Sequence, residues 1–232
     1  MVEALGWGAV AASSLLLGAL VGLVRPWPAR LVGLVLGFGA GALISAVSFE
    51  LAEDGVEIGG GAAVGIGLAA GALSYYACDS AIERRMGGDN AGAALALGAF
   101  LDGLPEQLVL GLGIALGTGV SAGLLAAIFI SNLPEAIGSS TAMQSAGRPR
   151  RDVVILWAGV AAICTLASVV GFAIADTASD TLQGAINGFA AGALVVMLVD
   201  SMIPEATRQA GRTTGLVTTL GFAVAAGMSG IG

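Results

Sequence analysis

The stretch AFLDGLPEQLVLG, residues 99–111, places an aspartate, a proline and a glutamate inside a run of otherwise apolar residues. A second stretch, IFISNLPEAIGSS, residues 128–140, repeats the phenylalanine and the Leu-Pro-Glu. Acids and prolines are both costly inside an apolar helix, because the acid loses its hydration and the proline removes a backbone hydrogen bond. Two such segments indicate that their acids share one chemical role. The composition of the whole chain indicates the environment of these segments.

The composition is that of an integral membrane protein. Of the 232 residues, 56% are hydrophobic and only 11% are charged, too few to cover the core of a soluble domain of this size. No long polar stretch is present, so we expect a single transmembrane domain over residues 1–232. Basic patches that would bind nucleic acid are absent. Cys78 and Cys164 lie in separate apolar segments and are expected to be buried packing residues.

Eight apolar segments are long enough to cross a bilayer, whose core of about 30 Å takes about 20 helical residues. The sequence therefore predicts an all-α integral membrane protein with eight transmembrane helices, separated by breaks rich in proline, glycine or charge. The predicted spans are approximately 5–24, 31–52, 58–81, 91–117, 120–143, 153–175, 182–205 and 214–231.

Arginine sets the predicted orientation of these spans. All nine basic residues are arginines, and each falls in an odd-numbered loop between the predicted spans. Because basic residues collect in the cytoplasmic loops of membrane proteins, both termini are expected outside. Arginine as the sole base, together with abundant alanine and glycine, is typical of a GC-rich prokaryotic genome, so we expect the inner (plasma) membrane.

The sequence resembles itself at an interval of 151 residues. The segment GFGAGALISAVSFELAED, residues 37–54, aligns with GFAAGALVVMLVDSMIPE, residues 188–205, and six of the first seven positions are identical. This interval pairs the second predicted span with the seventh and the first with the sixth. Spans five apart cross the membrane in opposite senses, so we predict an inverted repeat in which spans 1–3 and 6–8 surround spans 4 and 5. Such repeats are typical of secondary transporters.

Spans 4 and 5 carry the candidate site. Asp102 and Glu106 are four residues apart, so they project from one face of a helix. In the next span Ser131 and Glu135 stand in the same relation, and Asn132 lies beside Ser131. No predicted span carries a basic residue that could neutralise these acids. Because carboxylate, amide and hydroxyl oxygens are ligands of hard divalent cations, the five side chains are predicted to bind a divalent metal ion.

The acids of spans 4 and 5 are also compatible with roles besides metal transport. A carboxylate could be protonated and hydrogen-bonded as a structural group, or it could relay protons. The chain could carry protons or another small solute, or sense a metal without transporting it. Paired carboxylates could also serve an intramembrane hydrolase. Since the sequence shows no further catalytic partner and no nucleotide-binding motif, we do not expect an enzyme.

Further acids lie toward the ends of two paired spans and outline a route for the ion. Glu50, Glu53 and Asp54 lie toward the outer end of the second span. Asp200 and Glu205 lie toward the inner end of the seventh span. We interpret the two groups as entrance and exit ligands, and the alternative is that they are interfacial acids that stabilise helix ends.

These features together resemble the ZIP (Zrt-, Irt-like protein) family of divalent metal transporters. The likeness rests on eight spans with outside termini, on the repeat and on the Leu-Pro-Glu of spans 4 and 5, and it extends over the whole chain. It implies a mononuclear or binuclear site between these spans and import of the cation into the cytoplasm. It also implies a possible homodimer. The transported metal, of the zinc, iron, manganese or cadmium class, is the only cofactor implied.

The chain departs from the family at its histidines. The family pattern His-Asn-x-Pro-Glu-Gly reads Asp102-Gly103-Leu104-Pro105-Glu106-Gln107 in span 4, with Asp102 in place of a histidine, and Ser131 stands at the matching place in span 5. Span 6, where many members add a ligand, carries no acid. Oxygen-only ligation favours Mn²⁺, Mg²⁺ or Fe²⁺ by hardness, whereas Zn²⁺ outcompetes Mn²⁺ at sites of equal geometry. Ligand type alone therefore leaves the metal open.

Overall fold

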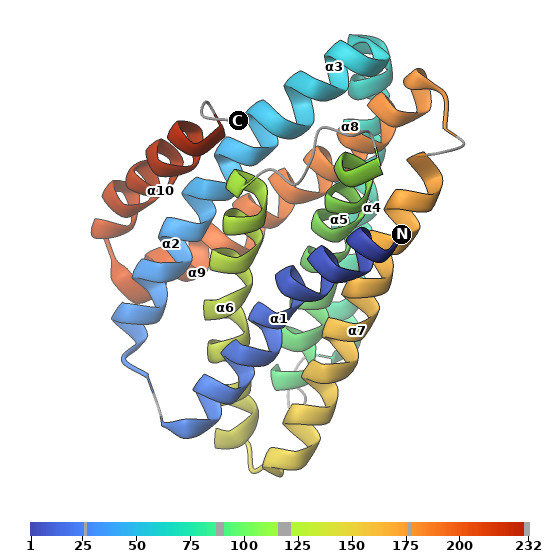
Figure 1. The fold of residues 1–232 in the computed structure, drawn as a ribbon. Coiled ribbons are helices and arrows are strands. Elements are labelled where there is room, and N and C mark those ends of the chain that lie inside the picture. The colour runs from blue at the N-terminus through green and yellow to red at the C-terminus, as the bar shows by residue number, and fades with distance from the viewer. Residues whose placement is uncertain (26, 87–90, 116–121, 176–177, 230–232) are drawn as a thin grey trace.

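Helices account for all the regular secondary structure that the computed structural model describes, which covers the chain apart from residues 26, 87–90, 116–121, 176–177 and 230–232 (Figure 1). The side chains of residues 83, 85–86, 91–99, 102 and 122 also lie outside that description. The helices are α1 Val2–Val24, α2 Ala29–Ala46, α3 Asp54–Gly59, α4 Gly61–Met86, α5 Ala91–Ala115, α6 Ala122–Ser145, α7 Arg150–Ala175, α8 Asp180–Met197, α9 Ile203–Ala210 and α10 Thr213–Ser229. Two π-helical segments, Val47–Glu53 and Leu198–Met202, join α2 to α3 and α8 to α9.

The predicted apolar segments coincide with single helices or with runs of joined helices, so the all-helical prediction is confirmed. Two runs are longer than predicted: one continues from α2 to Gly59 and the other from α8 to Ala210. The predicted breaks come too early because acidic and polar residues there lie on exposed helix faces and do not interrupt the helix. The residues after the two runs, Gly60 and Gly211, have φ values of 84° and 65°, which glycine adopts without steric cost.

The distribution of side chains is that of a protein surrounded by lipid. Large apolar side chains point outward, and Ile66, Leu73 and Leu216 are 72%, 70% and 77% exposed. Several polar side chains are instead buried among the helices. Five helical runs are long and apolar enough to cross a membrane within the described residues: Val2–Val24, Ala29–Gly59, Gly61–Ile82, Arg150–Ala175 and Asp180–Ala210. Gly103–Ala115 and Thr213–Met228 are shorter apolar helices.

The helix bounds recur at the interval of 151 residues that relates the sequence to itself. Adding 151 to the bounds of α2, Ala29–Ala46, gives the bounds of α8, Asp180–Met197. The same step carries Val47, the first residue of one π-helical segment, to Leu198, the first residue of the other. It also carries the last residue of α1 to the last residue of α7. In Figure 1, α2 and α8 run in opposite directions along the molecule.

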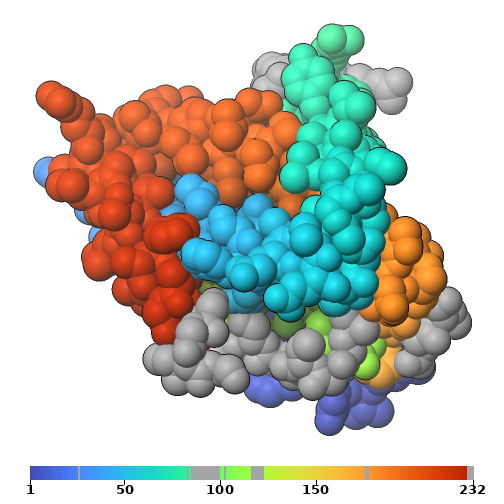
Figure 2. All heavy atoms as spheres, turned by 90° about the horizontal axis from the view of Figure 1, so that it is seen from above, coloured from blue at the N-terminus to red at the C-terminus, as the bar shows by residue number. Residues whose placement is uncertain are grey.

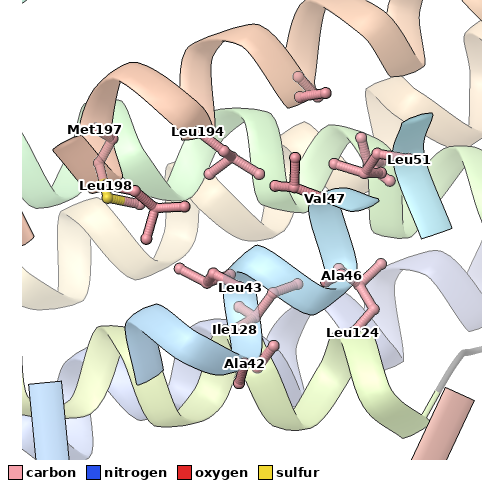
Figure 3. Close-up of a cluster of buried hydrophobic side chains, with 14 of the residues drawn as sticks. Ala42, Leu43, Ala46, Val47, Leu51, Leu124, Ile128, Leu194, Met197 and Leu198 are labelled. Atoms are coloured by element: carbon pink, nitrogen blue, oxygen red, sulfur yellow. The ribbon is translucent and has the colours of Figure 1, made fainter. Parts of the chain in front are cut away.

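The run that begins with α2 lies at the centre of the fold. Figure 3 shows one side of this run facing α8 and the other side facing α6, with buried apolar side chains filling both contacts. The side chains labelled there are Ala42, Leu43, Ala46, Val47, Leu51, Leu124, Ile128, Leu194, Met197 and Leu198. Seen from above, α2 and α3 lie between α10 and α4 (Figure 2). A second apolar cluster joins α1, α6 and α7 around Leu15 and Trp157, so α6 packs against both clusters.

Glycines let α4 approach α8, and α2 approach α10, at close range. A Cβ atom at Gly67 would lie 2.0 Å from the carbonyl oxygen of Ala185. A Cβ atom at Gly41 would lie 1.8 Å from the carbonyl oxygen of Thr218. Because both obstacles are backbone atoms, a side chain at either position displaces a whole helix. Small residues at helix contacts are the usual basis of close packing in membranes.

We expect Gly67→Ala to lower the free energy of unfolding by about 1–3 kcal/mol, the usual cost of overpacking. The matched control is Gly65→Ala on the same helix, where nothing lies within 4 Å of the added Cβ. Alanine favours a helix more than glycine does, so the control should be neutral or slightly stabilising. Thermal unfolding of the purified variants in detergent measures the difference, and equal midpoints would contradict the close α4–α8 contact.

Candidate metal site

The candidate site lies where α5 and α6 pack together. Glu106 follows Pro105 within α5, and Ser131 and Asn132 precede Pro134 within α6. Both helices continue through their proline. Since proline lacks an amide hydrogen, the carbonyl oxygen four residues earlier loses its helical donor. Each helix therefore offers a backbone oxygen close to the polar side chains.

Both carboxylate oxygens of Glu106 accept hydrogen bonds from α6. Ser131 Oγ donates to Oε1 over 3.4 Å, and Asn132 Nδ2 donates to Oε2 over 3.3 Å. Ser131 Oγ also lies 3.0 Å from the carbonyl oxygen of Ile128, so its single proton has two acceptors. Glu106, Ser131 and Asn132 are each 1% exposed. The structure thus brings together three of the five predicted ligands, from two helices and away from solvent.

These three side chains can exchange their mutual hydrogen bonds for a cation. The hydroxyl of Ser131 has lone pairs besides its proton, and Asn132 carries an amide oxygen besides its donating nitrogen. Both donors are neutral, so they orient the carboxylate of Glu106 without cancelling its charge. Exclusion of water strengthens the attraction between that charge and an arriving ion.

The other two predicted ligands are less fully placed. Glu135 lies on α6 one turn after Ser131 and is partly buried. Asp102 belongs to α5, one turn before Glu106, but its side chain lies outside the described residues. Among the described side chains, no three histidines, cysteines, aspartates or glutamates are close enough together to hold a metal ion. The hydrogen bonds given above thus join one acid, Glu106, to two neutral side chains.

The α2 run packs directly on the backbone of α6 at the site. A Cβ atom at Gly39 would lie 3.0 Å from Cα of Ser131 and 3.2 Å from the carbonyl oxygen of Ile130. Cε of Met202, at the end of the second π-helical segment, lies 3.1 Å from this Cβ position at Gly39. Glycine at position 39 thus lets both long runs approach the serine that contacts the buried carboxylate.

The predicted entrance acids belong to the helical run that continues α2. Glu50 lies in the π-helical segment and is partly buried, whereas Glu53 and Asp54 are exposed. Glu50, Glu53 and Glu57 are close enough to Asp54 for their charges to act on it. A concentration of like charge of this kind raises the local concentration of counter-ions.

The two predicted exit acids differ in their surroundings. Asp200 is exposed within the second π-helical segment. Glu205 is partly buried, forms an ion pair with Arg208 and accepts a hydrogen bond from Nε2 of Gln209. The sequence pattern predicts a loop at Arg208, whereas α9 continues to Ala210 and brings the arginine beside the acid. Glu205 therefore has the helix-stabilising contacts of an interfacial acid.

Two residues beside the site were not predicted as part of it. Gln107, directly after the site glutamate, is fully buried and donates from Nε2 to the carbonyl oxygen of Gly8 over 3.4 Å. Its amide inside an apolar run is the signal that could have identified it. Cys164 of α7 is buried with its sulfur against Gly103, a contact that sequence spacing does not reveal. Cys78 is exposed on α4, so the expectation that both cysteines are buried is wrong for this one.

The long apolar helices define a multi-pass membrane protein. No protein-family model matches the chain. The chain is similar to a protein of Arabidopsis thaliana named "Putative zinc transporter", with 31% identity over 190 residues. The similar region covers 77% of this chain and 30% of the plant protein, so it spans less than a third of the length of that relative.

Proposed function

We propose that this protein is a ZIP-like transporter that carries divalent metal cations across the membrane into the cytoplasm. The observation that carries the proposal is the buried carboxylate of Glu106, which the hydroxyl of Ser131 and the amide of Asn132 hold between α5 and α6. Carboxylate, amide and hydroxyl oxygens suit divalent cations of the zinc, iron and manganese class. The name of the Arabidopsis relative supports metal transport as the general function.

The proposed architecture is one transmembrane domain of eight spans with an inverted repeat. The helix bounds that recur at an interval of 151 support it, because they pair α2 with α8 and α1 with α7. The packing supports it as well: α4 packs on α8 as α10 packs on α2, and α1 packs on α6 as α7 packs on α5. Arrangements of this kind surround the substrate sites of many secondary transporters. We assign both termini to the outside of the plasma membrane, and we infer a homodimer from the family resemblance.

The cation in this proposal is a transported substrate, and the protein performs no chemistry on it. The ligands are Asp102, Glu106, Ser131, Asn132 and Glu135. A single carboxylate leaves a divalent ion half-neutralised, so binding draws further acids toward Glu106. Entrance begins at Glu50, Glu53 and Asp54, whose like charges attract cations from water. The cation is released past Asp200 and Glu205. Because Glu205 already forms an ion pair with Arg208, we assign the main role in release to Asp200.

Metal uptake into liposomes tests the function. Liposomes that contain the purified protein and a trapped metal-sensitive dye should respond to external Zn²⁺ or Mn²⁺, and empty liposomes should not. Glu135→Ala should slow uptake by about tenfold or more, since even outer-shell partners of metal ligands contribute a factor of 10–100 in affinity. Glu3→Gln, which removes an exposed acid at the start of α1, is the control and should transport normally. Uptake by the wild type equal to that of empty liposomes would overturn the proposal.

A further inference from the structure

A second group of buried polar atoms lies where α5 packs against α1 and α7. We call this contact the α1–α5–α7 seam and define it by Gly8, Gly103, Gln107, Cys164 and Ser168. The sulfur of Cys164 lies 2.9 Å from the position that a Cβ atom would take at Gly103, so it rests directly on the backbone of α5. Gly103 is three residues before Glu106, which places the thiol within one turn of the candidate metal site along α5.

Gln107 supplies an independent sign that the seam accepts a ligand. Its side chain is 0% exposed, and its Oε1 atom has no hydrogen-bond partner. Its Nε2 atom donates to the carbonyl oxygen of Gly8 over 3.4 Å, which fixes the amide toward α1. Its Oε1 lies 3.4 Å from a Cβ position at Gly8, and Ser168 Oγ lies 2.0 Å from the same position. A buried amide oxygen without a donor is rare in folded proteins and calls for an explanation such as a bound ion.

The thiol and this amide oxygen face the same seam. Gly103 and Gln107 are one turn apart on α5, and Cys164 and Ser168 are one turn apart on α7, so each helix presents its two residues on one side. Glu106 lies between these two positions in the sequence of α5 and follows Gly103, which the thiol contacts, by three residues. The seam therefore holds a sulfur and a neutral oxygen against the turn of α5 that carries Glu106.

We propose that Cys164 Sγ and Gln107 Oε1 bind the cation together with Glu106, and that this sulfur makes the site select Zn²⁺ or Cd²⁺ over Mn²⁺ and Mg²⁺. The proposal rests on the proposed transport function and names the substrate within it. A thiolate is a soft ligand that favours zinc, whereas manganese and magnesium favour oxygen. The thiol loses its proton to water as the metal–sulfur bond forms. The ligand set expected from the sequence contains only oxygen atoms, so it would then lack the sulfur that sets the metal preference.

Zinc K-edge X-ray absorption on the full chain in detergent, loaded with one equivalent of Zn²⁺, tests the proposal. The wild type should show a zinc–sulfur shell near about 2.3 Å in addition to oxygen at about 2.0–2.2 Å. Cys164→Ser should lose the sulfur shell, and Cys78→Ser, which removes the exposed thiol on α4, should keep it. In competition titrations, Cys164→Ser should bind Zn²⁺ about tenfold or more weakly and Mn²⁺ with unchanged affinity. The loss should be at least that seen when an outer-shell partner of a metal ligand is removed.

The outcomes separate this proposal from the function on which it rests. Zinc bound to the wild type through oxygen alone overturns the sulfur ligand and leaves the transport site standing. A sulfur shell that persists in Cys164→Ser also overturns it. A wild-type protein that retains no divalent cation overturns the proposed function itself. Cys164→Ala serves as a second variant if the serine destabilises the fold, and the wild-type spectrum alone decides whether zinc is bound through oxygen only.

Discussion

Glu106→Gln is expected to abolish measurable cation binding while the protein folds as well as the wild type or better. Removing one partner of a buried charge pair costs about 3–5 kcal/mol, which corresponds to about 100-fold or more in affinity because 1.4 kcal/mol is tenfold. The glutamine keeps the size of the glutamate and still accepts a hydrogen bond from Ser131. It also removes a charge from a place that is 1% exposed, where a charge is costly in the absence of a cation.

Two measurements on the same purified sample check this expectation. Calorimetric titration with Zn²⁺ and Mn²⁺ gives the affinity, and thermal unfolding in metal-free detergent solution gives the stability. The control Glu3→Gln removes an acid at an exposed position and should leave both unchanged. Wild-type affinity in Glu106→Gln would rule out this carboxylate as a ligand. A large loss of stability in the same variant would instead assign Glu106 a structural role.

Gly39→Leu is expected to block transport by separating the helices at the site. Its Cβ alone would lie 3.0 Å from Cα of Ser131 and 3.1 Å from Cε of Met202, and a leucine has three further carbons to place. The α2 run must therefore move away from α6, at a typical cost of about 1–3 kcal/mol for overpacking. Because Ser131 contacts Glu106, the displacement also changes the geometry around the carboxylate. We expect about a 100-fold loss of transport, in line with the effect of misplacing a binding group by about 1 Å.

Gly138→Leu separates this effect from a general effect of leucine in place of glycine. Position 138 lies on α6, and nothing lies within 4 Å of a Cβ atom built there. This variant should transport at close to the wild-type rate in the liposome assay. Equal transport by Gly39→Leu and the wild type would show that α2 is free to withdraw from α6 without consequence for the site.

Much of the fold follows from the sequence because length and hydrophobicity decide where membrane helices form. Within the described residues, each of the eight predicted segments falls on a helix or on consecutive helices, and the self-similarity at 151 residues reappears in the bounds of α2 and α8. The π-helical segments Val47–Glu53 and Leu198–Met202 were not predictable, since a shift in hydrogen-bond register leaves no mark on apolar periodicity. The continuation of both long runs to Gly59 and Ala210 was also missed, because charged residues on an exposed helix face look the same in sequence as those of a loop.

In the candidate site, too, residues marked by a local sequence pattern were predicted, whereas contacts between different helices were not. Glu106, Ser131 and Asn132 were predicted because buried polar groups beside prolines stand out in an apolar sequence. The contact of Cys164 with Gly103 depends on how α7 packs against α5, and residue spacing within one helix carries no information about it. The pairing of Glu205 with Arg208 was missed for a different reason, since the predicted end of a helix lay before the arginine.

The central claim is that a divalent cation occupies the contact between α5 and α6. Anomalous diffraction from crystals soaked in Mn²⁺, Zn²⁺ or Cd²⁺ locates such an ion without reference to transport. We expect a single strong peak within bonding distance of the carboxylate of Glu106 and the side chain of Asn132, with Glu135 turned toward it. Soaked crystals that show no peak there, with the carboxylate still bonded only to protein groups, would contradict the account.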